Sequence, residues 1–117
     1  MDRFVSLKKS ADYGRAYRQG RSYGNSLLVM YIFERGRDQE DRVGISVSKK
    51  VGNSVIRHLV KRRIREAVRT HPHGWKDGCD IVIVARPAAR SSNYQELLGA
   101  VLSAGTHLNV YSEHSHI

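Results

Sequence analysis

The chain has 117 residues and a formal charge of +9, from 20 Lys and Arg against 11 Asp and Glu. A hydrophobic content of 40% argues against a disordered chain, and the length suits one domain, residues 1–117, with its own core. No apolar run approaches the ~20 residues of a membrane span, and the polar N-terminus and the single cysteine favour a cytoplasmic protein over a secreted one.

The first predicted elements are a helix and two strands. Ser10 can cap a helix over 11–19 that Gly20 ends. Strands are expected over 25–34 and, after a charged turn, over 42–49. Along the second strand three apolar residues alternate with three small ones: Val43, Ile45 and Val47 with Gly44, Ser46 and Ser48. We expect helices to cover the apolar face and the small, polar face to form an open floor.

The next predicted element is a strongly basic helix that ends near Thr70. Eight of the chain's basic residues and a single acid, Glu66, lie in 49–69, and Asn53 or Ser54 can cap the helix. At about 100° per residue, the apolar side chains gather on one side: Ile56, Leu59, Val60, Ile64 and Ala67. The basic side chains and a histidine occupy most of the rest: Arg57, His58, Lys61, Arg62, Arg65 and Arg69.

This basic face lacks the acids that usually form i,i+4 pairs on a solvated helix, so its charges repel each other unless a polyanion is present. The pattern therefore favours nucleic acid as the partner. An anionic membrane surface or a role in solubility are alternatives. The apolar stripe lacks the Trp and Phe anchors of an interfacial helix, which argues against the membrane.

A loop, a strand and a helix complete the chain. The loop contains Pro72, and the apolar run over 80–86 predicts a buried strand that Pro87 stops. A last helix is expected over 93–107, and residues 108–117 are predicted to form a frayed tail. The order α-β-β-β-α-β-α predicts an α+β fold, with a small mixed sheet of about four strands and helices packed on one face.

Three tyrosines are candidates for stacking with bases. Tyr13 and Tyr17 share one edge of the first helix, and Tyr31 lies on the neighbouring strand. Beside a small polar floor, with arginines close by in sequence, they suit a single-stranded nucleic acid laid across the sheet. Tyrosines at helical spacing are also ordinary half-buried core residues, and both interpretations stay open.

The sequence does not predict a catalytic or metal site. A two-metal nuclease needs clustered carboxylates, and the acids of this chain are scattered. Asp77 and Asp80 near His71 and His73 could be imagined as metal ligands, but solvated loop residues explain them better. Cys79 opens an apolar strand and is expected to be a small buried residue.

Two other binding classes remain open. A stand-alone basic RNA-binding or ribosome-associated protein explains the helix and the open floor equally well. A DNA-binding module would place the helix in the major groove. The basic residues spread over more than half of its circumference, however, and the helix carries no Asn or Gln for adenine readout.

The run VGISVSKKVGNSVIRHLVKRRIREAVR resembles the signature of the bacterial ribonuclease P protein subunit. That signature consists of a G-L-S-V-S-K-K-like strand, a G-N-A-V-x-R turn and an R-N-R-x-K-R-x-x-R-E helix. The resemblance extends to LKKSADYGRAYRQGRSYGNSLLVMYIF upstream and to DIVIVARPAA downstream. It covers the chain except for about the last ten residues, and the ordered set is specific.

The resemblance implies a two-layer sandwich of the ferredoxin or ribosomal-protein-S5 type. It also implies that a large RNA with bound Mg2+ cleaves the 5′ leader from precursor tRNA, while the protein carries no catalytic group. The expected partners are this RNA, one protein per RNA, and precursor tRNA, and neither DNA nor a membrane. The residues expected to bind the catalytic RNA are Lys49, Asn53, Arg57, Lys61, Arg62, Arg65 and Arg69. Those expected to bind the leader are Tyr13, Tyr17, Tyr31, Ser46, Ser48 and Lys50.

The chain departs from the family pattern at a few positions. His58 and Leu59 stand where the motif has Asn and Arg, and Arg63 falls near the centre of the apolar stripe. Tyr13 and Tyr17 are more often Phe in the family. Tyrosine keeps the stacking surface, so the role of these rings is expected to survive.

Overall fold

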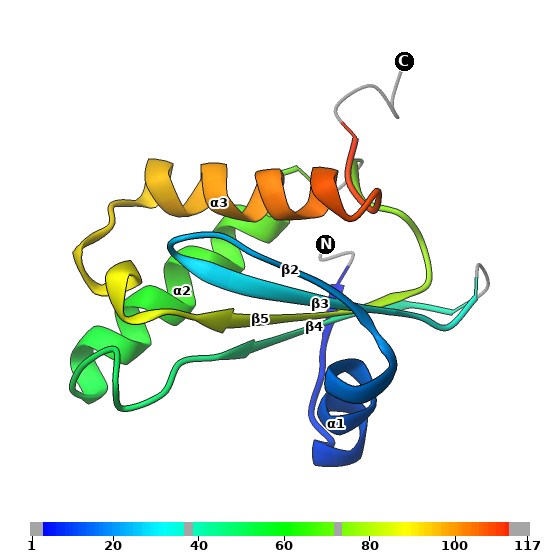
Figure 1. The fold of residues 1–117 in the computed structure, drawn as a ribbon, viewed down its shortest axis with the longest axis horizontal. Coiled ribbons are helices and arrows are strands. Elements are labelled where there is room, and N and C mark those ends of the chain that lie inside the picture. Colours follow the sequence, from blue (N-terminus) through cyan, green and yellow to red (C-terminus); the bar gives the residue numbers. More distant parts are fainter. Residues whose placement is uncertain (1–3, 37–38, 72–73, 113–117) are drawn as a thin grey trace.

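The computed structural model describes residues 4–36, 39–71 and 74–112. A single five-stranded sheet forms the centre of the molecule, with helices on both of its faces (Figure 1). The elements in chain order are β1 (Phe4–Ser6), α1 (Ser10–Gln19), β2 (Arg21–Gly24), β3 (Leu28–Glu34), β4 (Asp41–Ser46), α2 (Ser54–Arg69), β5 (Cys79–Ala85), a 3-10 helix (Pro87–Ser91) and α3 (Tyr94–His107). Among these described residues, no helix has the length and apolar character needed to span a membrane.

The sheet is mixed, as the sequence predicts. Its strands follow the order β1-β4-β5-β3-β2. The strands β1, β4 and β5 run parallel to each other, and β3 pairs antiparallel with both β5 and β2. β5 lies at the centre and is buried over most of its length because it has neighbours on both sides and helices on both faces. This explains why its sequence is apolar without alternation from Ile81 to Ala85.

The main core lies between the sheet and the pair α2 and α3. It contains one set of alternate strand residues, including Ile45, Ile81 and Ile83, packed against Ile64 of α2 and Leu97 of α3. Both helices have N-caps that fix where they start. The side chain of Asn53 accepts a hydrogen bond at the start of α2, and Asn93 and Glu96 form a capping box in α3.

α1 packs on the opposite face of the sheet, where Ala16 and Val82 are fully buried with Leu7 in a small second cluster. The α+β class is confirmed, but the expectation that all helices lie on one face is wrong. Ala16 is the only buried residue of α1. A single small buried side chain forms no apolar stripe on the helix, so the sequence could not predict which face of the sheet α1 covers.

The remaining differences concern short segments. The sheet has a fifth strand, β1, which is too short to show an alternating pattern, and β4 ends at Ser46 instead of continuing to Lys49. α1 begins at Ser10 itself, with Lys9 at the N-cap and without a side-chain capping bond.

The predicted frayed tail is wrong for the part that the structure describes. Leu108, Val110 and Tyr111 are buried, and Tyr111 forms a β-bridge with Trp75. Large apolar side chains bury their surface in the core, so this segment continues the fold beyond α3. Residues 113–117 lie outside the described residues.

Candidate nucleic-acid interface

The basic residues of α2 lie on its outer side, as predicted. Val60, Ile64, Ala67 and Val68 are buried against the core, while Lys61, Arg62 and Arg65 are exposed. The apolar residues follow a spacing of three and four, which places them on one side of the helix. α2 therefore holds its cations on a rigid surface directed away from the core.

The exposed cations of α2 have few acidic partners among the described residues. Within the described residues, Arg57, Lys61, Arg62 and Arg65 form no ion pair, and the Nε atom of Arg57 is buried without a hydrogen-bond partner. Only Arg69 pairs with an acid of the same helix, Glu66, at 3.3 Å. The mutual repulsion of these charges is relieved when a polyanion binds.

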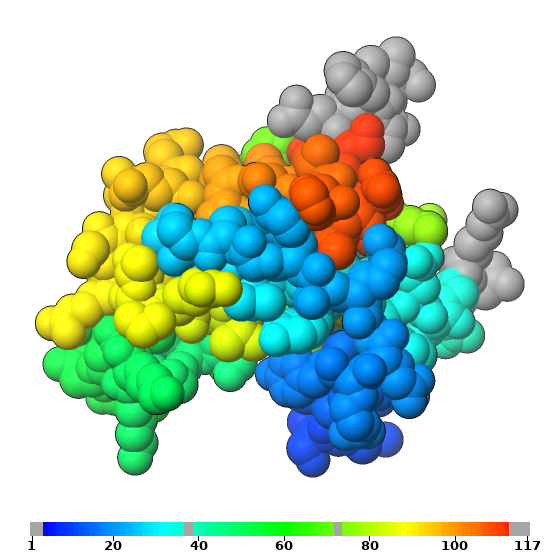
Figure 2. All heavy atoms as spheres, in the orientation of Figure 1, coloured from blue at the N-terminus to red at the C-terminus, as the bar shows by residue number. Residues whose placement is uncertain are grey.

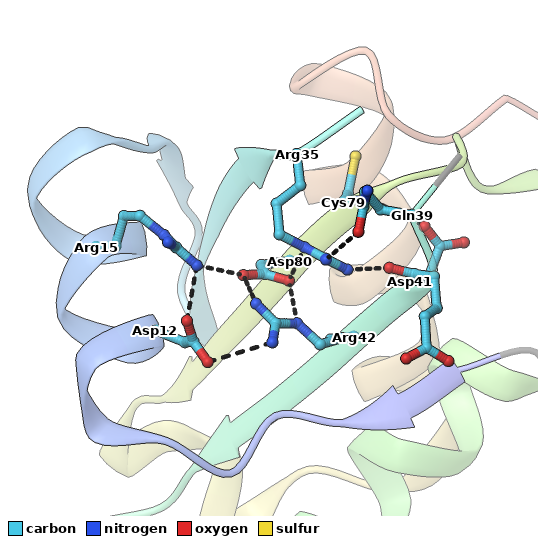
Figure 3. Close-up of polar contacts among 9 residues, drawn as sticks. Asp12, Arg15, Arg35, Gln39, Asp41, Arg42, Cys79 and Asp80 are labelled. Carbon is cyan, nitrogen blue, oxygen red and sulfur yellow. Dashed lines mark hydrogen bonds and ion pairs between the residues drawn. The ribbon is translucent and has the colours of Figure 1, made fainter. Parts of the chain in front are cut away.

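Three arginines on the opposite face of the sheet, by contrast, each pair with one or both of two aspartates (Figure 3). Asp80 is fully buried, and both of its carboxylate oxygens accept hydrogen bonds from Arg42, at 2.8 and 2.7 Å. Arg35 donates to the same carboxylate at 2.8 Å. A buried carboxylate is stable only when such partners compensate the loss of water.

The same cluster holds α1 on the sheet. Asp12 of α1 accepts from Arg15 at 2.7 Å and from Arg42 of β4 at 3.2 Å. Arg15 also lies 3.7 Å from Asp80, and its guanidinium stacks 4.8 Å from the centre of the Phe33 ring. We refer to Asp12, Arg15, Arg35, Arg42 and Asp80 as the Asp80 cluster. It is a set of residues that sequence reasoning missed.

One signal in the sequence pointed to this cluster. Asp80 is a charged residue at the start of an apolar, buried strand, and such a charge requires a partner. The partners lie 38, 45 and 65 residues away along the chain, so the sequence could not name them. The alternative idea of a metal site with His71 is not supported, because Asp80 already binds arginines. His73 lies outside the described residues.

The three predicted tyrosines meet beside α1. The rings of Tyr17 and Tyr31 are 4.9 Å apart at an angle of 81°, and those of Tyr13 and Tyr17 are 6.4 Å apart. Tyr17 remains 41% exposed, so one ring of the group is open to a ligand. We call Tyr13, Tyr17 and Tyr31 the tyrosine surface.

The face of the sheet beside the tyrosine surface, which was expected to be an open floor, is partly covered by α1: Val82 and Gly44 are buried and Ser46 is half-buried. Tyr31, Val82 and Gly44 lie in one row across three strands, and Ser46 is in the next row. A side chain at Gly44 would collide with Tyr13, since a Cβ atom there would lie 2.5 Å from the tyrosine hydroxyl. Glycine at this position lets the Tyr13 ring lie directly on β4. Figure 2 shows a hollow between the blue spheres of α1 and the green spheres of α2.

The hydroxyls of Tyr13 and Tyr17 stay uncharged at neutral pH. Burial raises the pKa of Tyr13 above its ordinary value, and burial followed by the neighbouring phenols raises the pKa of Tyr17. A phenolate on this surface would repel phosphate groups. The raised pKa values of Tyr13 and Tyr17 extend to higher pH the neutral form that suits base stacking.

The other predicted residues lie at the junction between β4 and α2. Ser48, Lys49 and Lys50 are exposed in the turn after β4, and Ser48 accepts a hydrogen bond from the Lys50 backbone at 3.4 Å. Asn53 caps α2 by accepting from the Ile56 N–H at 3.0 Å. The side chain of Asn53 thus has a structural role, whatever else it contacts.

The departures at positions 58, 59 and 63 have different consequences. His58 is exposed and Leu59 is half-buried on α2, so the positive charge of the motif is absent at position 59. The guanidinium of Arg63 donates to the Ser92 carbonyl at 2.9 Å. Arg63 therefore links α2 to the end of the 3-10 helix and does not add to the exposed basic face.

Cys79 is fully buried, and burial raises the pKa of its thiol to about 11. The thiolate is the reactive form, so Cys79 should not react with iodoacetamide at pH 8 in the folded protein. Labelling followed by mass spectrometry checks this, with the protein in urea as the positive control. Rapid labelling without urea would contradict the buried position.

Comparison with known proteins decides among the classes of nucleic-acid-binding protein that this geometry permits. A family model described as Ribonuclease P matches residues 1–109. The chain belongs to the ribonuclease P protein family. Ribonuclease P is a ribonucleoprotein endonuclease that processes the 5′ end of tRNA, and members of this family are its protein component. The resemblance in the sequence is thus confirmed.

Relatives in the ribonuclease P family match nearly the whole chain. The ribonuclease P protein component of Clostridium novyi (strain NT) is 43% identical over 107 residues, which cover 91% of this chain and 95% of the relative. That of Lachnoclostridium phytofermentans is 46% identical over 97 residues, 83% of each chain. The solved structure of the Staphylococcus aureus RNase P protein is similar with a TM-score of 0.83 and 33% identity, covering 92% of this chain and 97% of that one. The predicted fold class is confirmed by this similarity.

Proposed function

We propose that this ribonuclease P protein docks on the catalytic RNA through the basic face of α2 and holds the single-stranded 5′ leader of precursor tRNA on the tyrosine surface. One observation carries the proposal. Arg57, Lys61, Arg62 and Arg65 of α2 have no acidic partner within the described residues, whereas each arginine of the Asp80 cluster pairs with an aspartate. Charges left unpaired on a rigid helix are available for phosphates.

The two surfaces suit different tasks. Lysine and arginine contacts to phosphates fix the position of a folded RNA without reading its sequence. An exposed ring such as Tyr17 stacks on any base, which suits a leader whose sequence varies. Mature tRNA lacks the leader, so the second surface raises affinity for the precursor over the product.

The chemistry of cleavage is proposed to belong to the RNA. We propose that the Mg2+ ions that serve the reaction are bound mainly by the RNA, since the described residues contain no group of three His, Cys, Asp or Glu placed to hold a metal ion. The protein then affects substrate binding, the magnesium requirement and product release. We also propose one protein per RNA, and the cytoplasmic location stays a prediction.

Tyr17→Ala should lower the preference of the reconstituted enzyme for precursor over mature tRNA by about tenfold, because one base–aromatic stack is worth about 1–3 kcal/mol. Equilibrium binding of both tRNAs to the protein–RNA complex measures this ratio. Tyr23→Ala is the matched control, since Tyr23 stacks on His107 with ring centroids 3.8 Å apart. It projects with Met30 toward the main core, away from the tyrosine surface. An unchanged ratio for Tyr17→Ala would remove the tyrosine surface from the leader site.

A further inference from the structure

The strand β4 has an open edge where β1 stops. β1 pairs only as far as Ser6 with Val43, and the Leu7 N–H donates to the Val43 carbonyl at 2.9 Å. The chain then enters α1, whereas β4 continues to Ser46. Alternate residues of a strand direct their backbone groups to the same side. The N–H and C=O groups of Ile45 therefore point to this uncovered edge.

The carbonyl of Leu7, which would accept a hydrogen bond from Ile45 if β1 were longer, is bonded to another group. In a continued parallel ladder the Leu7 carbonyl would receive the Ile45 N–H. The hydroxyl of Tyr13 donates to this carbonyl instead, at 3.3 Å. Over residues 4–36 and 39–71, no backbone hydrogen bond joins Leu7 to Ile45. The Ile45 peptide is thus available to a ligand, one donor and one acceptor side by side.

The open edge lies in a depression between β1, β4 and α2. Its floor and walls include Phe4, Val43, Gly44 and Val68, together with the ring of Tyr13. The cations on its rim come from successive turns of one helix: Lys61, Arg65 and Arg69. The lining contains no carboxylate. Lys61 and Arg65 also have no acidic partner within the described ranges.

The depression joins the two surfaces of the proposed function, since Tyr13 belongs to the tyrosine surface and Lys61 and Arg65 to the basic face. We propose that it binds one nucleotide of a single-stranded RNA segment, with the phosphate on Lys61 and Arg65 and the edge of the base on the Ile45 peptide. A peptide with a free donor and acceptor matches the hydrogen-bonding edge of an unpaired base. This inference rests on the proposed function and adds a site that reads a base to surfaces that bind phosphates and rings.

Nuclear magnetic resonance of the full-length 15N-labelled protein tests the site. Titration with an unstructured four-nucleotide RNA should shift the amide signals of Ile45 and Gly44 in a saturable manner. Lys61→Gln with Arg65→Gln should weaken this binding by about tenfold or more, because the pair of changes removes both cations that are proposed to contact the one phosphate. The slope of log affinity against log salt concentration should also fall by about 1.4. Arg90→Gln removes an exposed charge from the 3-10 helix and should leave the shifts unchanged.

Two outcomes would overturn the inference. If inorganic phosphate alone produces the same shifts at Ile45, the site is an anion site and reads no base. If the oligonucleotide shifts other signals of α2 but not Ile45, RNA avoids the depression, and the proposed function still stands. Failure of the whole protein to bind the catalytic RNA would instead refute the proposed function.

The source of the nucleotide is a separate question with a direct answer. Photo-crosslinking from 4-thiouridine placed in the leader, or in single-stranded segments of the catalytic RNA, should mark the peptide that contains Ile45 in one of the two complexes. A crosslink from the leader assigns the depression to the substrate, and a crosslink from the catalytic RNA assigns it to the enzyme. Absence of the crosslink from both, with other protein crosslinks present, would contradict the site.

Discussion

Asp80→Asn should lower the free energy of unfolding by about 3–5 kcal/mol, because removing one partner of a buried ion pair leaves the other uncompensated. The carboxylate of Asp80 is fully buried and receives hydrogen bonds from Arg35 and Arg42. Such a loss is a large part of the about 5–15 kcal/mol that stabilises a typical domain. Equilibrium unfolding in urea, followed by circular dichroism, measures it.

The loss should affect α1 before the rest of the fold. Arg15 and Asp12 connect α1 to the Asp80 cluster, and the apolar cluster beneath α1 is small. Hydrogen exchange of the α1 amides should therefore accelerate in Asp80→Asn more than exchange in β5. Glu40→Gln is the control, since it removes an exposed carboxylate near the same end of β4 and should change stability by less than about 0.5 kcal/mol. Equal stability of Asp80→Asn and Glu40→Gln would contradict the role of the cluster.

Changing Arg57 and Arg62 together to Gln should weaken binding of the catalytic RNA on the order of 100-fold. Each arginine is expected to contact a phosphate, and a hydrogen bond to a charged group is worth about 1.5–3 kcal/mol. The slope of log affinity against log salt should fall by about 1.8, because each lost phosphate contact removes about 0.9. Filter binding of the RNA at several salt concentrations measures both effects.

The fold of this double variant should remain intact, since neither residue is among the buried residues of α2 and the buried Nε atom of Arg57 makes no hydrogen bond that the change would remove. Its urea midpoint should match that of the unchanged protein. Arg90→Gln again serves as the control, because it removes a positive charge from the 3-10 helix and not from α2. Equal weakening by Arg90→Gln would show that net charge alone drives binding and would contradict a specific role for α2.

The sequence predicted those elements whose pattern is local. α2 could be predicted with its cap because its apolar residues repeat with a helical spacing and Asn53 stands at the start. The apolar run that became β5 and the alternation that became β4 were equally clear. In each case the residues that decide the structure lie within one or two turns or strand repeats of each other.

The features that could not be predicted depend on contacts between distant parts of the chain. β1 is three residues long and exists because it pairs with β4, 37 positions away in register. The face that α1 covers depends on Val82 and on the Asp80 cluster, which the sequence of α1 does not contain. Tyr111 is buried because it packs against Trp75, which lies 36 positions earlier in the chain. The polar residues that follow Tyr111 in the sequence give no sign of this contact.

The candidate site was predictable to a similar extent. The exposed cations of α2 and the grouping of the three tyrosines follow from helical periodicity and strand adjacency. The depression at Ile45 does not, because it arises from the early end of β1 and from the hydrogen bond of the Tyr13 hydroxyl. Which of these residues bind RNA stays a prediction.

Cleavage of a precursor tRNA at low, near-physiological magnesium tests most directly whether the protein acts as a subunit of ribonuclease P. A bacterial ribonuclease P RNA is assayed with the protein, without it, and with the protein alone. The protein should restore cleavage at the mature 5′ end and should be inactive without the RNA. Cleavage by the protein alone, or an RNA whose activity the protein does not change, would contradict this role.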